Sequence, residues 1–110
     1  MRLIAANYIY LPDFPLAKNS YVRLLSSKKI ELVDSGGELK EIPGLEFYGG
    51  LIVPEYIYGC ESSFVLEKDL LLQLDDLFLQ KGNEYVSVAI IEGADLQELK
   101  WTSGAKVRLL

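Results

Sequence analysis

The chain has 110 residues, half of them hydrophobic, with a formal net charge of −5 and no histidine. This length supports one domain with one core, and the composition is that of a globular protein rather than a disordered one. The negative balance argues against binding to a phosphate backbone, and without histidine the chain lacks the commonest general base and metal ligand. No apolar run approaches the ~18 residues of a membrane-spanning helix, so we expect a cytoplasmic protein that binds neither nucleic acid nor membrane.

The first third of the sequence predicts short β-strands. Residues 2–10 are almost continuously apolar and aromatic, which suits a strand that is covered on both faces. Pro12 and Pro15 end this run, because proline removes a ladder donor and fixes the backbone. Two further strand-like runs, 21–25 and 30–33, flank a polar turn, so we expect a β-hairpin there.

The middle of the chain continues with strands around a pair of glycines. Residues 38–42 form at most one helical turn, and strand-like runs at 45–48 and 51–53 flank Gly49 and Gly50. The two glycines are not followed by the Lys-Ser/Thr of a phosphate loop. They therefore predict a β-bulge or a tight bend.

One amphipathic helix is predicted over 67–81. It has Glu67 and Asp69 in its first turn, and Gly82 is a natural residue to end it. Its apolar positions recur at helical spacing: Leu70, Leu74, Leu77 and Phe78. Three more leucines widen the apolar arc: Leu71, Leu72 and Leu79. We therefore expect this helix to be covered on more than one side.

The chain is expected to close with two more strands, at 85–91 and 106–110. Between them, residues 96–101 are compatible with either a short helix or an extended segment. The whole pattern predicts a single domain over 1–110 that is mainly β. We expect a small β-sandwich or partly closed barrel with one inserted α-helix.

Both ends of the sequence resemble one family. The stretches Arg2 to Tyr10, Lys29 to Val33 and Gly50 to Pro54 resemble the opening of metal-dependent amidohydrolases, especially the deaminase and chlorohydrolase branch. The stretches Ala89 to Leu96 and Val107 to Leu110 resemble the end of the same family. In that family, these two ends together build a small composite β-domain beside the catalytic barrel.

The resemblance implies that segments 1–54 and 85–110 form the small β-domain. The short insert 55–84 then stands in place of the barrel. In the family, the Val-Pro pair is followed by glycine and then by a His-x-His pair that binds the catalytic metal. Here Glu55 stands at the glycine position, while Cys60 and Ser62 stand where the histidines would be. A thiol and a hydroxyl cannot rebuild that site, so we expect no catalytic residue, no metal and no cofactor.

The remaining reactive groups favour ordinary structural roles. Cys60 is the only cysteine and its neighbour is Glu61, which does not favour a thiolate, so an inert thiol is expected. Asp75 and Asp76 are adjacent on the predicted helix and point about 100° apart. They are therefore expected on a solvated face rather than in a carboxylate metal site.

The preferred function is a non-catalytic, amidohydrolase-like interaction or structural module. Alternatives are a small-molecule binding domain with a pocket near Tyr56, Tyr58 and Cys60, an enzyme of unrecognised type, and a relic of a deleted amidohydrolase gene. We expect a homodimer that forms through residues 55–81, with an unknown protein partner as the other option. The candidate interface residues are Tyr56, Tyr58, Leu71, Leu72 and Leu79.

Overall fold

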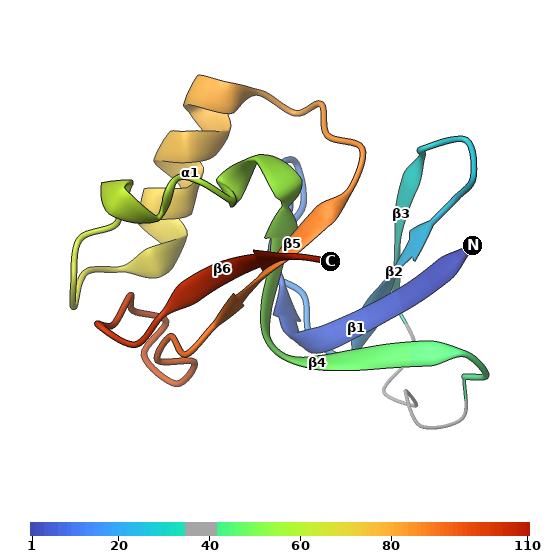
Figure 1. Ribbon diagram of the computed structural model, residues 1–110, viewed down its shortest axis with the longest axis horizontal. Helices are drawn as coiled ribbons and strands as arrows, with labels where there is room; N and C mark the ends of the chain where they lie inside the picture. Colours follow the sequence, from blue (N-terminus) through green and yellow to red (C-terminus); the bar gives the residue numbers. More distant parts are fainter. Residues whose placement is uncertain (35–41) are drawn as a thin grey trace.

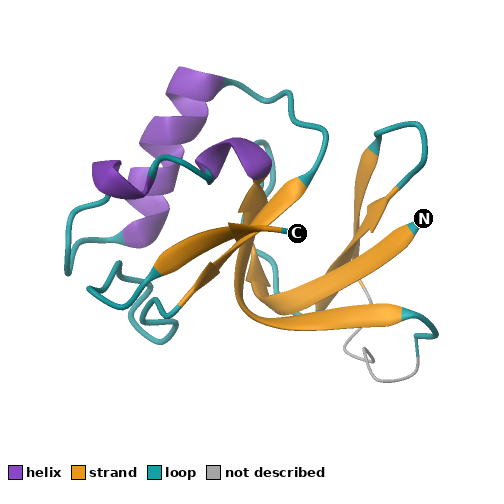
Figure 2. Cartoon of the chain, viewed as in Figure 1, coloured by secondary structure: helices purple, strands orange, loops and turns teal. Residues whose placement is uncertain are grey.

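The computed structural model describes residues 1–34 and 42–110. Within them, six strands form one mixed sheet in the order β3-β2-β1-β4-β5-β6, with one α-helix, α1, beside it (Figures 1 and 2). The elements are β1 (Arg2–Ile9), β2 (Ser20–Leu24), β3 (Ile30–Asp34), β4 (Leu45–Pro54), η2 (Glu55–Ile57), η3 (Glu61–Ser63), α1 (Leu70–Lys81), β5 (Val88–Glu92) and β6 (Lys106–Leu109). The prediction of a mainly β domain with one helix is confirmed. The sheet is open, with β3 and β6 as its edges, and is not closed into a barrel.

The sheet combines strands from both ends of the sequence. β1 lies near its centre, antiparallel to β2 and parallel to β4, and β5 joins β4 to the edge strand β6. The predicted hairpin is present between β2 and β3, where the Leu25 amide donates to the Lys29 carbonyl at 3.0 Å. The helical turn expected at 38–42 lies outside the described residues, apart from Ile42.

The glycine pair forms the predicted bulge. Ala6 of β1 pairs with Tyr48, but Tyr8 pairs with Leu51, so two residues of β4 oppose the single Asn7. The Asn7 side-chain oxygen accepts a hydrogen bond from the Gly50 amide at 2.8 Å. Gly50 has a φ of 146°, which a side chain would rarely adopt. The bulge lies where β4 curves (Figure 1). The curve divides the sheet into two arms, one with β1, β2 and β3 and the other with β5 and β6.

Each face of the bent sheet supports its own apolar cluster. One cluster lies between α1 and the β4–β5–β6 arm and contains Leu51, Leu74, Phe78, Ile91 and Trp101. The other lies on the opposite face and contains Ile4, Val22, Ile52, Val88 and Ile90. Alternation along β5 explains this division, since successive side chains of a strand point to opposite faces.

The structure corrects two boundaries and the conformation expected for one segment. The helix begins at Leu70 rather than at residue 67, because Glu67 has a left-handed φ of 62° and the side chain of Asp69 caps the first turn. β5 begins at Val88 rather than at residue 85. Residues 96–101 form neither a helix nor a strand but a turn, closed by backbone hydrogen bonds between Asp95 and Lys100.

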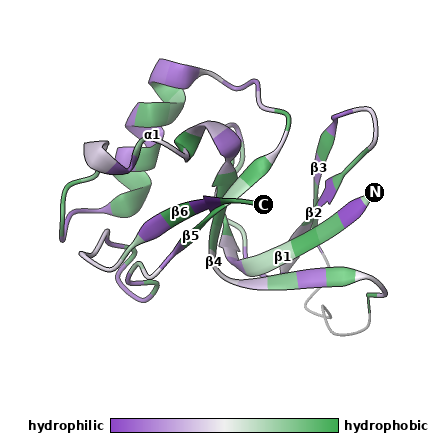
Figure 3. Ribbon diagram, in the orientation of Figure 1, coloured by the Kyte–Doolittle hydropathy of each residue, from purple (hydrophilic) through white to green (hydrophobic). Residues whose placement is uncertain are grey.

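The described residues bury only one side of α1. Its buried residues are Leu70, Leu74, Leu77 and Phe78, all on one face. Within residues 1–34 and 42–110, the expectation that the helix is covered on more than one side is therefore not met. Along the ribbon of α1, hydrophobic and hydrophilic residues alternate (Figure 3). Within residues 1–34 and 42–110, no helix is both long and apolar enough to cross a membrane.

Candidate protein-interaction surface

The helix α1 is fixed to the rest of the domain by aromatic side chains. The Tyr10 hydroxyl donates a hydrogen bond to the Asp75 carboxylate, and the Tyr10 ring lies 5.5 Å from the ring of Phe78. Tyr56 packs edge-on against Phe78 at 6.3 Å, and its hydroxyl donates to the Gly82 carbonyl at 2.9 Å. Burial raises the pKa of Tyr56 to about 12, so this phenol stays neutral and keeps its role as a donor. These contacts fix α1, and with it the outer face of the helix, against the rest of the domain.

Two leucines lie on that outer face. Leu72 is 63% exposed and Leu79 is 85% exposed. They are seven residues apart, so at 3.6 residues per turn they differ by only about 20° around the helix axis. Asp75 and Asp76 lie between them, one helical turn from each. We refer to Leu72, Asp75, Asp76 and Leu79 as the outer stripe.

Among the described residues, three other exposed apolar side chains are scattered. Phe47, Val86 and Leu109 are also half-exposed or more, but they lie on different strands and loops of the domain. Single apolar residues at a surface are normal in globular proteins. Leu72 and Leu79 differ because they share one face of a fixed helix.

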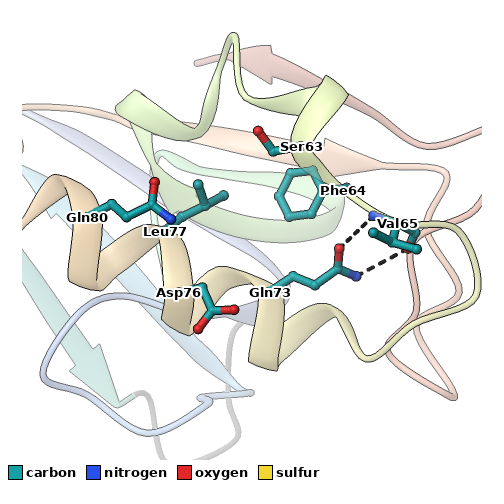
Figure 4. A pocket seen from close by; sticks show the side chains of 7 residues that line it. All are labelled: Ser63, Phe64, Val65, Gln73, Asp76, Leu77 and Gln80. Carbon is teal, nitrogen blue, oxygen red and sulfur yellow. Dashed lines mark hydrogen bonds between the residues drawn. The ribbon is translucent and has the colours of Figure 1, made fainter.

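One flank of the outer stripe carries a shallow pocket of about 250 Å³ (Figure 4). The side chain of Gln73 closes one end, because its oxygen accepts from the Val65 amide at 2.6 Å and its nitrogen donates to the Val65 carbonyl at 3.3 Å. Asp76 and Gln80 extend from α1 along the pocket (Figure 4). The remaining lining residues are Ser63, Phe64 and Leu77.

The other flank carries a second pocket, of about 280 Å³, near the C-terminal end of α1. Its apolar lining comes from Pro12, Phe78 and Leu79, and its polar lining from Asp13, Asp75 and Asn83. The Asn83 side chain donates to the Asp13 carboxylate at 2.7 Å, which joins the loop after β1 to the loop after α1. We call this the acidic pocket. Both pockets fall below the roughly 300–1,000 Å³ that is usual for small-molecule sites.

The structure separates the residues predicted as an interface. Leu72 and Leu79 lie together on the outer stripe, and Tyr58 is 53% exposed on a separate loop. Tyr56 and Leu71 are only partly exposed, because both pack against the core cluster beneath α1. Of the five predicted residues, Leu72 and Leu79 therefore lie on the outer stripe, and Tyr58 is exposed apart from them.

Neither of these two pockets lies at the predicted small-molecule site near Cys60. Neither hollow is lined by Tyr56, Tyr58 or Cys60. The Cys60 thiol donates to the Tyr56 carbonyl at 3.3 Å and is partly buried. Within the described ranges, no group of three or more His, Cys, Asp or Glu residues is placed to hold a metal ion.

Sequence reasoning missed the residues that surround the outer stripe. Val65, which hydrogen-bonds with Gln73 of α1, is 54% exposed. Asp13 and Asn83 are brought together from positions 70 residues apart. Only Leu72 and Leu79 could be recognised from the local sequence. A helix with one buried face needs only the apolar residues of that face, and these two leucines are additional to them.

A polar network on the opposite side of the sheet was also missed. The Arg2 guanidinium donates two hydrogen bonds to Glu46, at 3.0 and 2.8 Å, and the Tyr48 hydroxyl donates a third at 2.8 Å. Arg108 lies 5.6 Å above the Tyr48 ring and forms an ion pair with Glu92 at 3.0 Å. These contacts connect β1, β4, β5 and β6, so they hold the two arms of the sheet in place.

Comparisons of the chain with models of protein families, with curated proteins and with solved structures found no match. The amidohydrolase relationship suggested by the sequence therefore stays a prediction.

Proposed function

We propose that this chain is a non-catalytic interaction module whose contact surface is the outer stripe of α1. The observation that carries this proposal is the exposure of Leu72 and Leu79 on one face of a helix whose opposite face is packed against the core. Burying a leucine side chain contributes roughly 1.5–3 kcal/mol relative to leaving it in water. A protein surface that covers both leucines would recover part of that free energy.

A second copy of the chain is the partner that we propose. Closed two-fold pairs are the commonest soluble oligomers, and a helix face that carries Leu72 and Leu79 can contact its own copy. Leu72 and Leu79 alone make a small contact. The exposed Val65, which hydrogen-bonds with Gln73 of α1, can extend it.

The proposal of a non-catalytic role rests on the residues that the chain offers. The whole sequence contains no histidine and a single cysteine, and the thiol of that cysteine is engaged with a backbone carbonyl. Nucleophilic catalysis needs a base beside the nucleophile. A small composite β-domain of amidohydrolase type, or a relic of one, remains a proposal for the ancestry of this module.

Sedimentation equilibrium at micromolar concentrations tests the proposed function. We expect the wild-type chain to associate to twice its mass, and we expect Leu79→Asp or Leu72→Asp to shift it toward the monomer by at least about tenfold in Kd. Ser27→Asp is the control, because it adds the same charge in the exposed β2–β3 turn, away from α1. A wild-type mass that stays monomeric at every concentration, unchanged by these substitutions, would contradict the self-association.

A further inference from the structure

The strand β6 ends the sheet with an edge whose outward backbone groups are unpaired. It pairs with β5 on one side and is the last strand of its arm (Figure 1). The Leu110 amide, just after β6, donates to the Val88 carbonyl of β5 at 3.2 Å. Backbone groups of successive residues alternate in direction along an antiparallel strand, so those of Val107 and Leu109 point away from β5. No hydrogen bond between described residues engages these outward groups.

The side chains of β6 give this edge two different faces. Toward α1, Val107 is buried in the core cluster, and Leu109, two residues on, is 50% exposed on the same face. On the opposite face, Lys106 and Arg108 are both exposed. A strand laid beside β6 would therefore meet apolar side chains on one face and cationic side chains on the other.

The cationic face of β6 is only partly neutralised. Arg108 forms an ion pair with Glu92 at 3.0 Å. Lys106 lies opposite Glu92 in the β5–β6 register, but it forms no ion pair with any described residue. Glu46, on the neighbouring strand β4, is already paired with Arg2 at 2.8 Å. Two cations thus share one carboxylate at this edge, and one positive charge is left without a counter-charge.

A second copy of the chain does not fit this edge. Two β6 strands related by a two-fold axis would run antiparallel, and directly opposed side chains would share one face of the joined sheet. An axis through Val107 would set Lys106 of each copy opposite Arg108 of the other. An axis through Lys106 or Arg108 would set that residue opposite itself. Like charges directly opposite destabilise a strand pair, and cationic residues protect natural edges from self-pairing in this way.

We infer that the β6 edge is a docking site for an extended segment of another protein in which acidic and apolar residues alternate. Such a segment would add a strand to the sheet through the outward amides and carbonyls of Val107 and Leu109. Its acidic side chains would lie beside Lys106 and Arg108, and its apolar side chains would lie on the face toward α1. The site is separate from the outer stripe, so this inference goes beyond the proposed function.

A peptide titration tests the inference. The probe is a seven-residue peptide with capped ends, in which valine and glutamate alternate. We expect it to bind the wild-type chain in fluorescence anisotropy and to slow the amide hydrogen exchange of Val107 and Leu109, measured by NMR. Lys106→Glu should weaken binding by about fivefold or more, because one opposite-charge contact becomes a like-charge contact. A peptide in which valine and lysine alternate should bind the wild type more weakly by a similar factor.

Matched controls separate strand addition from simple charge attraction. The glutamate peptide with N-methylated backbone amides keeps its charges but cannot donate to the ladder, so it should not bind. Lys29→Glu makes the same charge change in the β2–β3 turn and should bind as the wild type does. Circular dichroism checks the folding of Lys106→Glu, and Lys106→Gln, which only removes the charge, should give an intermediate loss.

Three results would overturn the docking site: no slowed exchange at Val107 and Leu109 at millimolar peptide, protection at β3 instead, or equal binding of the glutamate and lysine peptides. Leu79→Asp should bind the glutamate peptide as the wild type does, since it alters only the outer stripe. Failure of self-association through α1 therefore leaves this inference standing, and failure of the peptide to bind leaves the proposed function standing.

Discussion

The Glu46 carboxylate accepts more hydrogen bonds than its position near a sheet surface would suggest. Arg2 donates two of them and the Tyr48 hydroxyl donates the third. The hydrogen bonds from Arg2 are the main reason that the pKa of Glu46 falls to about 2, and the bond from Tyr48 lowers it further. The folded state therefore favours the ionised carboxylate, and Glu46 couples the folding of β1 and β4 to pH.

Replacing Glu46 by glutamine should reduce stability at neutral pH more than at acidic pH. The stabilising contribution of the wild-type carboxylate is fully present above the pKa of the unfolded chain, near 4.5. It is lost as the pH falls from there through about 2. Since the Arg2–Glu46 pair is partly exposed, we expect Glu46→Gln to lower the free energy of unfolding by about 1 kcal/mol or less at pH 7.

Urea unfolding at several pH values measures this difference. The gap between the wild type and Glu46→Gln should narrow steadily as the pH falls below about 4. Glu98→Gln, in an exposed turn, is the matched control and should follow the wild type throughout. A gap that is constant with pH would show that Glu46 acts through packing rather than through its charge.

Single-residue contacts of this kind could not be read from the sequence. Arg2 and Glu46 are 44 positions apart, and their contact depends on the parallel pairing of β1 with β4. The acidic pocket depends in the same way on Asp13 and Asn83. Leu72 and Leu79 could be predicted as surplus apolar residues, because helical periodicity is a local property.

At the scale of elements, the bulge of β4 controls how the sheet bends. Gly50 has a φ of 146°, and a Cβ atom built there would lie 2.2 Å from the Ile91 carbonyl oxygen of β5. That oxygen belongs to the backbone of the neighbouring strand and cannot move aside without breaking the ladder. The close approach of β4 and β5 therefore requires a glycine at this position.

Gly50→Ala should destabilise the domain strongly, by about 2 kcal/mol or more, through both backbone strain and the collision with β5. Gly49→Ala is a matched control in the next position, because a Cβ there would meet only the Asn7 side-chain oxygen at 3.9 Å. Thermal unfolding followed by circular dichroism compares the two. Equal melting temperatures for the two variants would contradict the account of the bulge.

Periodicity predicted the elements more reliably than their ends or their pairing. The four residues at helical spacing are the buried side of α1, because the pattern reports the face that meets the core. The helix start was misplaced, because acidic residues suit both the first turn and the position before it, where Asp69 acts as the cap. The parallel pairing of β1 and β4 was not predicted, since register depends on contacts that no local pattern contains.

At the scale of the whole molecule, β5 joins the two apolar clusters. Ala89 and Ile91 belong to the cluster beneath α1, while Val88 and Ile90 belong to the cluster on the opposite face. All four residues are fully buried. The C-terminal part of the chain thus supplies core residues to both faces of a sheet whose first strand in the sequence is β1.

A chain that ends at Gly82 should therefore fail to fold. It would lack β5 and β6, and it would also lose Trp101, which stacks on Phe64 at 4.5 Å beside the N-terminal end of α1. The strand β4 would become an unpaired edge with buried apolar residues on both faces. Stability of a domain this small depends on most of its core, so the remaining strands cannot compensate for the loss.

Denaturation of the fragment that ends at Gly82 measures this dependence. We expect no cooperative transition in urea and a spectrum without folded β-structure, whereas a control that lacks only Leu109 and Leu110 should still unfold cooperatively. The control keeps all of β5 and most of β6, and Leu109 is half-exposed. If the Gly82 fragment were soluble and melted cooperatively, β1 to α1 would form an independent core. The outer stripe of α1 would then be carried by a unit smaller than the six-stranded sheet.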